Sequence, residues 1–288
     1  MLCVRQFSRQ VNGMLLLASL IELMIYIYAL SLLFYFSDCV SRSVRSRRIG
    51  AGLLGVTALL QFSVIAVRTV LENRPPLFSV YDFLFLFVFV LTVTGFALAL
   101  TQKAEFVVLL LGIVGFTASV LNEFWFPVGV HAEHIGYTQK LLLILHVVLA
   151  NLSLVALTIA AVFGILYLFL YAMLKKKKWN DTVRRLPSLE QTERWAHVAV
   201  LTGTPLLIVS LLVAFLLIVA QRRWEMLLDV KGITTFAALA VYGLYFLLKR
   251  TRKYSGFSIA KWTLAGYALV IINLISNAFS EYHKWNGG

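Results

Sequence analysis

The chain has 288 residues, of which 60% are hydrophobic and only 14% are charged, and its mean hydropathy is +0.86. A water-soluble protein of this composition would have nowhere to place its apolar surface, so a soluble globular fold is excluded. The net charge of +13 does not indicate nucleic-acid binding, because the basic residues form short clusters between apolar runs. Lipid headgroups and insertion topology account for such clusters.

Eight apolar runs follow one another along the sequence, each close to the length of about 20 residues that a membrane-spanning helix needs. They cover residues 14–37, 50–71, 80–100, 105–126, 140–173, 197–220, 231–248 and 259–280. The first run is too long for a signal-peptide core and no cleavage site of small residues follows it, so we expect it to remain as a helix. The sequence therefore predicts an all-α integral membrane protein, a bundle of about eight transmembrane helices that forms a single domain over residues 1–288.

The lysines and arginines are shared unevenly between the connections. Seventeen of the 26 lie in connections that follow the first, third, fifth and seventh predicted helices. Because basic connections stay on the cytoplasmic side, this bias predicts a multi-pass protein of the cell membrane, inner or plasma, with both termini outside. The most basic connection, residues 174–196, contains Ser188, Leu189 and Glu190, and this segment predicts a short interfacial helix.

Cysteine and histidine usage limits the possible chemistry. Cys3 and Cys39 form no C-x-x-C or C-x-x-C-H motif, which excludes a thiol oxidoreductase and covalent haem attachment. His146 near the start of the fifth helix and His283 at the end of the eighth lie on the same membrane face, because an even number of crossings separates each from the amino terminus. His197 lies at the opposite face without a comparable partner, and we assign it no role.

Two readings of His146 and His283 remain open. Neutral imidazole is a good iron ligand, and two opposed imidazoles complete the axial positions of a haem. Alternatively, each histidine bonds a backbone carbonyl or a lipid headgroup at a helix end. A polar stripe at the end of the eighth helix leads to His283. Its side chains either hydrogen-bond neighbouring helices or form part of a ligand site. Its members are Asn273, Ser276, Asn277, Ser280 and Glu281.

The connection after the sixth helix places further candidates on the face of His146 and His283. Trp224 has the flat surface needed to stack on a macrocycle, and Arg222 or Arg223 has the charge to pair with propionates. Interfacial tryptophans and arginines also occur at headgroup depth in most membrane proteins, so this alternative stays open. Arg68 lies before a proline-rich hairpin, where a structural role and contact with an anionic ligand are both possible.

Five segments, taken in order, resemble the cytochrome c assembly family of the CcsA/ResC type, and most closely its HemX-like branch. They are residues 74–83 (RPPLFSVYDF), 145–148 (LHVV), 167–179 (YLFLYAMLKKKKW), 229–231 (DVK) and 280–285 (SEYHKW). The resemblance implies a haem b held non-covalently, with His146 and His283 as axial iron ligands. Trp224, Asp229, Arg222 and Arg223 would then shape the pocket.

The sequence departs from the family pattern in two places. The tryptophan-dense loop of the family, ending W-x-W-D-P-K, is reduced to Trp224 with residues 229–231, and the helix-7 histidine of the synthetase is replaced within residues 245–248 (YFLL). HemX-like members are associated with haem biosynthesis genes and with lower levels of glutamyl-tRNA reductase. This association favours a protein that senses or holds haem over one that attaches it.

The sequence bears on three possible functions. The first is a non-enzymatic, haem-handling membrane protein linked to cytochrome assembly or haem homeostasis, whose partners are membrane lipid and cytochrome c assembly proteins. The second is a regulatory scaffold that acts on glutamyl-tRNA reductase through residues 174–196 and does not need haem. The third is a small-solute transporter, which is disfavoured because the charges gather at helix ends and not at the membrane midplane.

Overall fold

The structure, a computed structural model, describes residues 2–72, 75–77, 79–100, 105–125, 137–177, 185–222, 224, 229–251 and 254–276, with the backbone alone at 2–12, 137 and 138. In these residues eight helices are long and apolar enough to cross a membrane, as the sequence predicts. They are α1 (Leu2–Ser41), α2 (Val44–Glu72), α3 (Val80–Ala99), α4 (Glu105–Trp125), α5 (Tyr137–Lys175), α7 (Leu189–Gln221), α8 (Val230–Thr251) and α9 (Gly256–Ser276). The chain is therefore an all-helical, multi-pass membrane protein.

Helix α7 begins eight residues before the apolar run that predicts it. Ser188 is its N-cap, and the Ser188 side chain and the Gln191 side chain form reciprocal bonds with the backbone at 3.2 and 3.3 Å. This capping box satisfies two of the N–H groups that every helix start leaves unpaired. Ser188, Leu189 and Glu190 therefore belong to the start of α7 and not to a separate helix. The stretch for which a short interfacial helix is predicted also contains residues 178–184, which lie outside the described residues.

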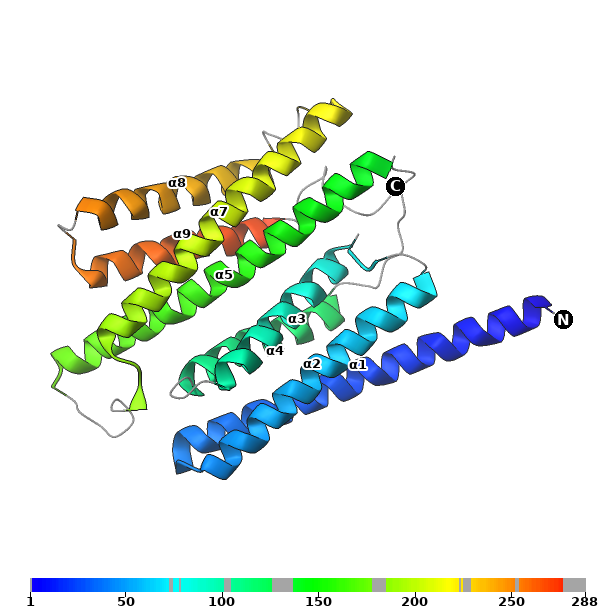
Figure 1. Cartoon of the computed structure of the whole chain (residues 1–288), viewed down its shortest axis with the longest axis horizontal. Helices are drawn as coiled ribbons and strands as arrows, with labels where there is room; N and C mark the ends of the chain where they lie inside the picture. Colours follow the sequence, from blue (N-terminus) through cyan, green and yellow to red (C-terminus); the bar gives the residue numbers. More distant parts are fainter. Residues whose placement is uncertain are drawn as a thin grey trace. The chain divides into compact units, whose positions relative to one another are not determined.

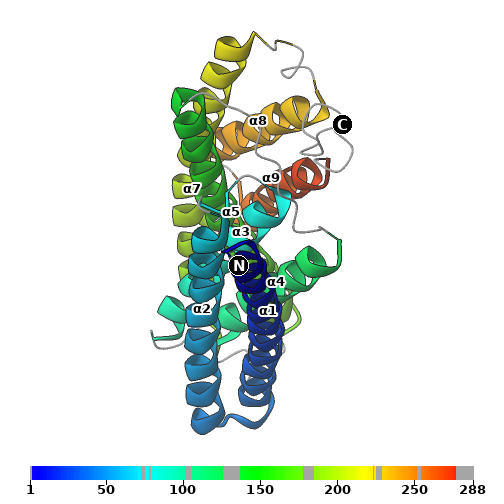
Figure 2. The same cartoon turned by 90° about the vertical axis from the view of Figure 1, so that its right-hand side faces the viewer.

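The chain divides into two compact units, Met1–Val130 and His131–Gly288. In the first unit, α1 packs on α2, α2 on α3, α3 on α4 and α4 back on α1. Figure 1 shows the four helices running alongside one another, and Figure 2 shows α1 and α2 side by side. This closed ring is an up-and-down four-helix arrangement, in which short connections join antiparallel neighbours.

One end of the first unit is fixed by a buried charge on α2. The Arg68 guanidinium contacts Asp82 of α3 and donates to Glu72 at 2.8 Å, while its own side chain is 3% exposed. Asp82 also completes a capping box with Ser79 at the start of α3, at 3.0 and 3.1 Å. The α2–α3 hairpin is thus tied together by one arginine and two carboxylates.

The second unit is organised around α5. Two-thirds of the most apolar window of α5 is buried, more than in any other spanning helix in the described residues. Helices α7 and α9 pack on α5, and α8 packs mainly on α9. Tyr242 of α8 and Leu157 of α5 lie at the centre of the apolar core, with no exposed surface. The start of α5, the end of α7 and the start of α8 lie towards the same end of this unit (Figure 1).

Candidate functional site

His146 lies in α5 with its imidazole half-buried against α7. Its Nδ1 lies 2.9 Å from the backbone carbonyl oxygen of Ser210 and 2.9 Å from the Ser210 hydroxyl. The Ser210 hydroxyl donates in turn to the backbone carbonyl of His146 at 3.2 Å. A carbonyl oxygen only accepts, so this geometry requires the proton on Nδ1. The lone pair of the ring then lies on Nε2.

Small residues allow α7 to approach α5 closely two turns away from this contact. Ser153 lies seven residues after His146 on α5, and Gly203 lies seven residues before Ser210 on α7. The Ser153 hydroxyl donates to the Gly203 carbonyl at 2.8 Å. A Cβ on Gly203 would lie 2.8 Å from the Leu157 side chain, which is closer than real Cβ contacts. The absence of a side chain at residue 203 therefore sets the separation of the two helices and, with it, the position of Ser210 beside His146.

Arg222 and Trp224 lie just beyond the end of α7, and both are exposed. Arg222 is the C-cap, with a left-handed φ of 54°, and its backbone N–H bonds back to the last turn. Trp224 is 53% exposed and meets the ring of Phe215 edge-on, with centroids 6.4 Å apart. Arg222 and Trp224, both predicted from the sequence, therefore lie at the end of the second unit where α5 begins.

Asp229 precedes α8 and stabilises its start. Its carboxylate accepts from the backbone N–H of Val230 at 2.8 Å, and its carbonyl accepts from Ile233 at 3.0 Å. An acidic side chain at a helix N-terminus also interacts favourably with the helix dipole. Asp229 thus has a local structural role, whatever further role it has in a pocket.

Arg223 and His283 lie outside the described residues, as do Asn277, Ser280 and Glu281 of the predicted polar stripe. Of the two described members of the stripe, Asn273 bonds a neighbouring helix and Ser276 bonds its own. The Asn273 amide donates to the Lys231 carbonyl and to the hydroxyls of Thr234 and Thr235, at 2.7 to 2.8 Å, and so joins α9 to α8. Ser276 donates to the Asn273 carbonyl at 2.7 Å.

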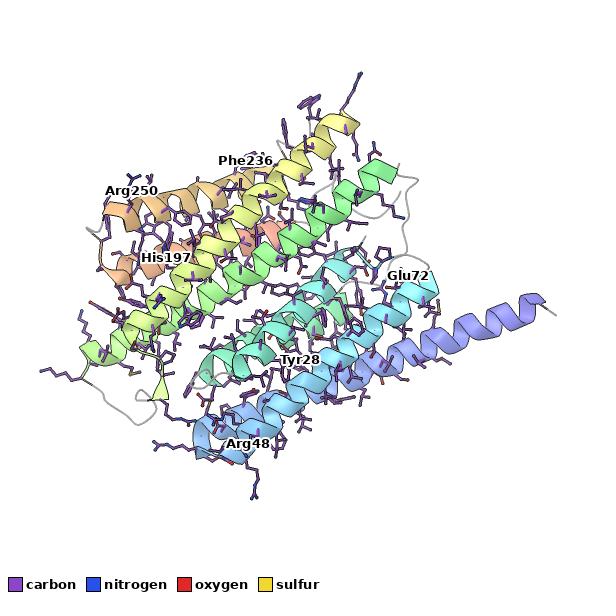
Figure 3. All side chains as sticks on the ribbon, viewed as in Figure 1. Tyr28, Arg48, Glu72, His197, Phe236 and Arg250 are labelled. Atoms are coloured by element: carbon purple, nitrogen blue, oxygen red, sulfur yellow. The ribbon has the colours of Figure 1, made fainter. Side chains whose placement is uncertain are left out.

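His197, to which the sequence assigns no partner, has one in the structure. Its Nδ1 lies 2.9 Å from the Tyr245 hydroxyl of α8, and its ring also meets Phe246 edge-on. Figure 3 labels His197 on α7. One turn away, Glu193 of α7 forms an ion pair with Lys249 of α8. Sequence reasoning missed these contacts because they join residues about 50 positions apart, and only the helix register brings them together.

In the part of the chain that the structure describes, no group of three or more His, Cys, Asp or Glu side chains has the arrangement of a metal site.

Comparison with known proteins places the chain in a defined context. Residues 77–283 match the family described as cytochrome C assembly protein. The chain is 29% identical over 264 residues to Protein HemX of Brevibacillus brevis, covering 92% of this chain and 97% of that protein. It is 28% identical over 268 residues to Protein HemX of Bacillus subtilis (strain 168), covering 93% and 97%.

Proposed function

Because the chain belongs to the cytochrome c assembly protein family, we propose that it is a haem-handling membrane protein that binds a b-type haem non-covalently. In this proposal His146 and His283 are the axial iron ligands, and Trp224, Asp229, Arg222 and Arg223 shape the pocket. The observation that carries it is the 2.9 Å contact between Nδ1 of His146 and the Ser210 carbonyl, a bond that the alternative interpretation also contains but that leaves Nε2 available to iron. The family match, which ends at residue 283, spans both histidines.

The donor chemistry of His146 fits this role. A metal-ligating histidine almost always donates its other ring N–H to a carbonyl, carboxylate or water, which fixes the tautomer and raises the basicity of the ligating nitrogen. Ser210, which is 1% exposed, provides this contact from the buried side of α7. Ligation of iron would then use Nε2.

The remaining residues act by binding and orientation. Trp224 offers an aromatic face for stacking, and the guanidinium groups of Arg222 and Arg223 match carboxylates such as propionates. A bound haem supplies the redox chemistry of its iron and a group to be transferred or sensed. The protein itself makes and breaks no covalent bond in this proposal, so it is not an enzyme.

The test is a haem titration of the purified protein in detergent, followed by absorbance. We expect wild type to show the Soret and α/β bands of a six-coordinate haem, and His146→Ala and His283→Ala to lose them. His197→Ala is the matched control and should keep the wild-type spectrum, because His197 bonds Tyr245 at the opposite end of α7. A wild type that stays colourless after haem addition contradicts the proposal, and unchanged bands in both histidine variants contradict the ligand assignment.

Ser210→Ala gives a finer readout of the same site. The lost hydroxyl should weaken haem affinity by about tenfold, the lower end of the range for outer-shell partners of metal ligands. The effect stays at this lower end because the carbonyl of residue 210 still accepts from Nδ1. An affinity equal to wild type would show that the Ser210 hydroxyl does not orient the ligand.

A second candidate function is regulation of glutamyl-tRNA reductase levels without haem. Lys175 ends α5, and the exposed Lys176 and Lys177 continue the basic run beyond it. Neutralising residues 175–178 should then change the reductase level while membrane insertion is preserved, and His146→Ala should leave it unchanged. If the reductase level instead follows His146 and ignores the lysines, haem binding is the primary function.

A further inference from the structure

A cavity of about 290 Å³ lies in the second unit, at the end where α7 and α9 begin and α8 ends. Three helices and one connection line it, through Glu193 in the second turn of α7, Lys249 in the last turn of α8, Tyr254 after α8 and Ile259 in the first turn of α9. Figure 3 labels Arg250, the neighbour of Lys249, at this end of α8. Ser210, the partner of His146, lies 17 residues beyond Glu193 on α7, about 25 Å at about 1.5 Å per residue. The cavity is therefore separate from the candidate haem site.

The positions of the lining residues along their helices place the cavity at the depth of the lipid headgroups. Glu193 lies four residues before the apolar run of α7, Lys249 lies one residue after that of α8, and Ile259 begins that of α9. Tyr254 is 50% exposed, and Trp195, two residues after Glu193, is 53% exposed. Tyrosine and tryptophan gather where headgroups meet hydrocarbon, because one end of each side chain is apolar and the other is polar. We therefore expect an amphiphilic occupant.

The cavity presents one charge of each sign. The Lys249 ammonium forms an ion pair with the Glu193 carboxylate, and the two side chains are 30% and 33% exposed. An ammonium has three donors and a carboxylate has about four lone-pair sites, so this ion pair leaves both groups able to bind a ligand. An anion without a cationic group would be attracted by Lys249 but repelled by Glu193. The matching ligand carries both an anion for Lys249 and an N–H cation for Glu193.

The Glu193 carboxylate is positioned from the side of α9. A Cβ on Gly256 would lie 2.7 Å from Oε2 of Glu193 and would overlap the Tyr167 hydroxyl of α5. The absence of a side chain at residue 256 therefore allows the start of α9 to approach both groups. A helix N-terminus stabilises a nearby carboxylate through its dipole. The acidic side of the cavity is thus held by α9 as well as by Lys249.

We propose that this cavity binds the headgroup of phosphatidylethanolamine. The lipid phosphate accepts from the Lys249 ammonium, and the primary ammonium of the headgroup donates to the Glu193 carboxylate. Phosphatidylglycerol lacks this ammonium, and the trimethylated nitrogen of phosphatidylcholine has no N–H to donate. The site therefore selects one lipid by the pattern of its charges and donors. This binding is independent of haem in the same unit.

The test measures lipid binding to the purified full-length protein in detergent by native mass spectrometry. Dioleoyl-phosphatidylethanolamine, its mono- and dimethylated forms and dioleoyl-phosphatidylcholine share their phosphate and chains but have successively fewer N–H donors. We expect the affinity of wild type to fall along this series by about tenfold, the size of one lost hydrogen bond to a charged group. Dioleoyl-phosphatidylglycerol should also bind more weakly than phosphatidylethanolamine. Equal affinity for all these lipids overturns the proposal, and this arm needs no variant to fold.

Variants assign the two charges. Glu193→Gln should abolish the preference for phosphatidylethanolamine over phosphatidylglycerol, because Lys249 alone favours the anionic lipid, whereas Lys249→Met should weaken the binding of both. Glu190→Gln and Arg250→Met are the matched controls and should keep the wild-type preference, since both residues are exposed and neither lines the cavity in the described part of the chain. Thermal midpoints without lipid should stay near wild type, because an exposed ion pair contributes little to stability. A preference that survives Glu193→Gln, or that the controls lose equally, overturns the assignment.

Soluble phosphoethanolamine distinguishes a lipid from a free metabolite with the same headgroup chemistry. At an equal concentration it should not displace the lipid, because without acyl chains it buries no apolar surface. Displacement would show that the cavity takes a soluble zwitterion, and it would overturn the assignment to a phospholipid.

Discussion

At the scale of single residues, Arg68 shows how one buried charge can define a hairpin. Its guanidinium is shared by Asp82 and Glu72, and it stacks over the Tyr81 ring at 5.2 Å from the centroid. A planar group with five donors can serve three neighbours in fixed directions, which an ammonium cannot. Sequence reasoning placed Arg68 at a structural hairpin, and its contacts with Glu72 and Asp82 support that interpretation.

Replacing Arg68 with methionine should strongly destabilise the protein. The variant removes the Arg68 guanidinium from Asp82, which is 3% exposed, and breaking a buried pair in this way costs about 3–5 kcal/mol. Lys249→Met is the control, since both side chains of the Lys249–Glu193 pair are about a third exposed and such pairs contribute about 0–1 kcal/mol. Denaturant unfolding of both variants in detergent measures the difference. An equal loss of unfolding free energy in the two variants would show that Arg68 is not the main stabilising residue of the α2–α3 hairpin.

The candidate site illustrates what the sequence can and cannot predict about individual residues. His146 is recognisable as an ionisable side chain inside an apolar run, and such residues are uncommon in spanning helices. Ser210 carries no such signal, because serine is common between helices and lies 64 positions away. Only the register of α5 against α7 makes it the partner of His146.

At the scale of elements, hydropathy predicts where helices exist, and capping chemistry decides where they begin. The eight predicted runs agree with the eight spanning helices, whereas α7 starts earlier because Ser188 and Gln191 form a capping box before the apolar run. The predicted run of 259–280 extends beyond the last described residue of α9, Ser276. Small residues in the interface set the distance between two packed helices. Hydropathy does not predict this distance.

Gly203 provides the test of helix approach. Gly203→Val should destabilise the protein by about 1–3 kcal/mol, the usual cost of overpacking, because a Cβ there would press on Leu157 and Ala156. Gly243→Val in α8 is the matched control, since no atom lies within 4 Å of its added Cβ. For Gly203→Val alone, we expect a lower unfolding midpoint and a weaker haem affinity than for wild type. If Gly243→Val lowers the unfolding midpoint and the haem affinity as much as Gly203→Val does, the helix propensity of valine and not the approach of the helices is responsible.

At the scale of the whole molecule, the alternation of spans is the strongest inference from the sequence. Each span reverses the direction of the chain, so the starts of α5 and α8 must share a face however the protein is inserted. Figure 1 shows them towards the same end of the second unit. The chain forms two compact units, although the family match at residues 77–283 crosses their boundary, and a single domain over residues 1–288 stays a prediction.

The absolute orientation follows from the distribution of basic residues, which predicts Lys177 inside and Trp224 outside. Both are exposed and lie just beyond helix ends, with the single span α7 between them. In a background with Cys3→Ser and Cys39→Ser, an impermeant maleimide should label Trp224→Cys in intact cells and Lys177→Cys only after permeabilisation. The reverse pattern would invert the protein but keep His146 and Asp229 on one face, because that relation depends only on the number of crossings. Labelling of both positions from the same side would contradict the spanning of α7 itself, and with it the shared face on which the proposed haem site depends.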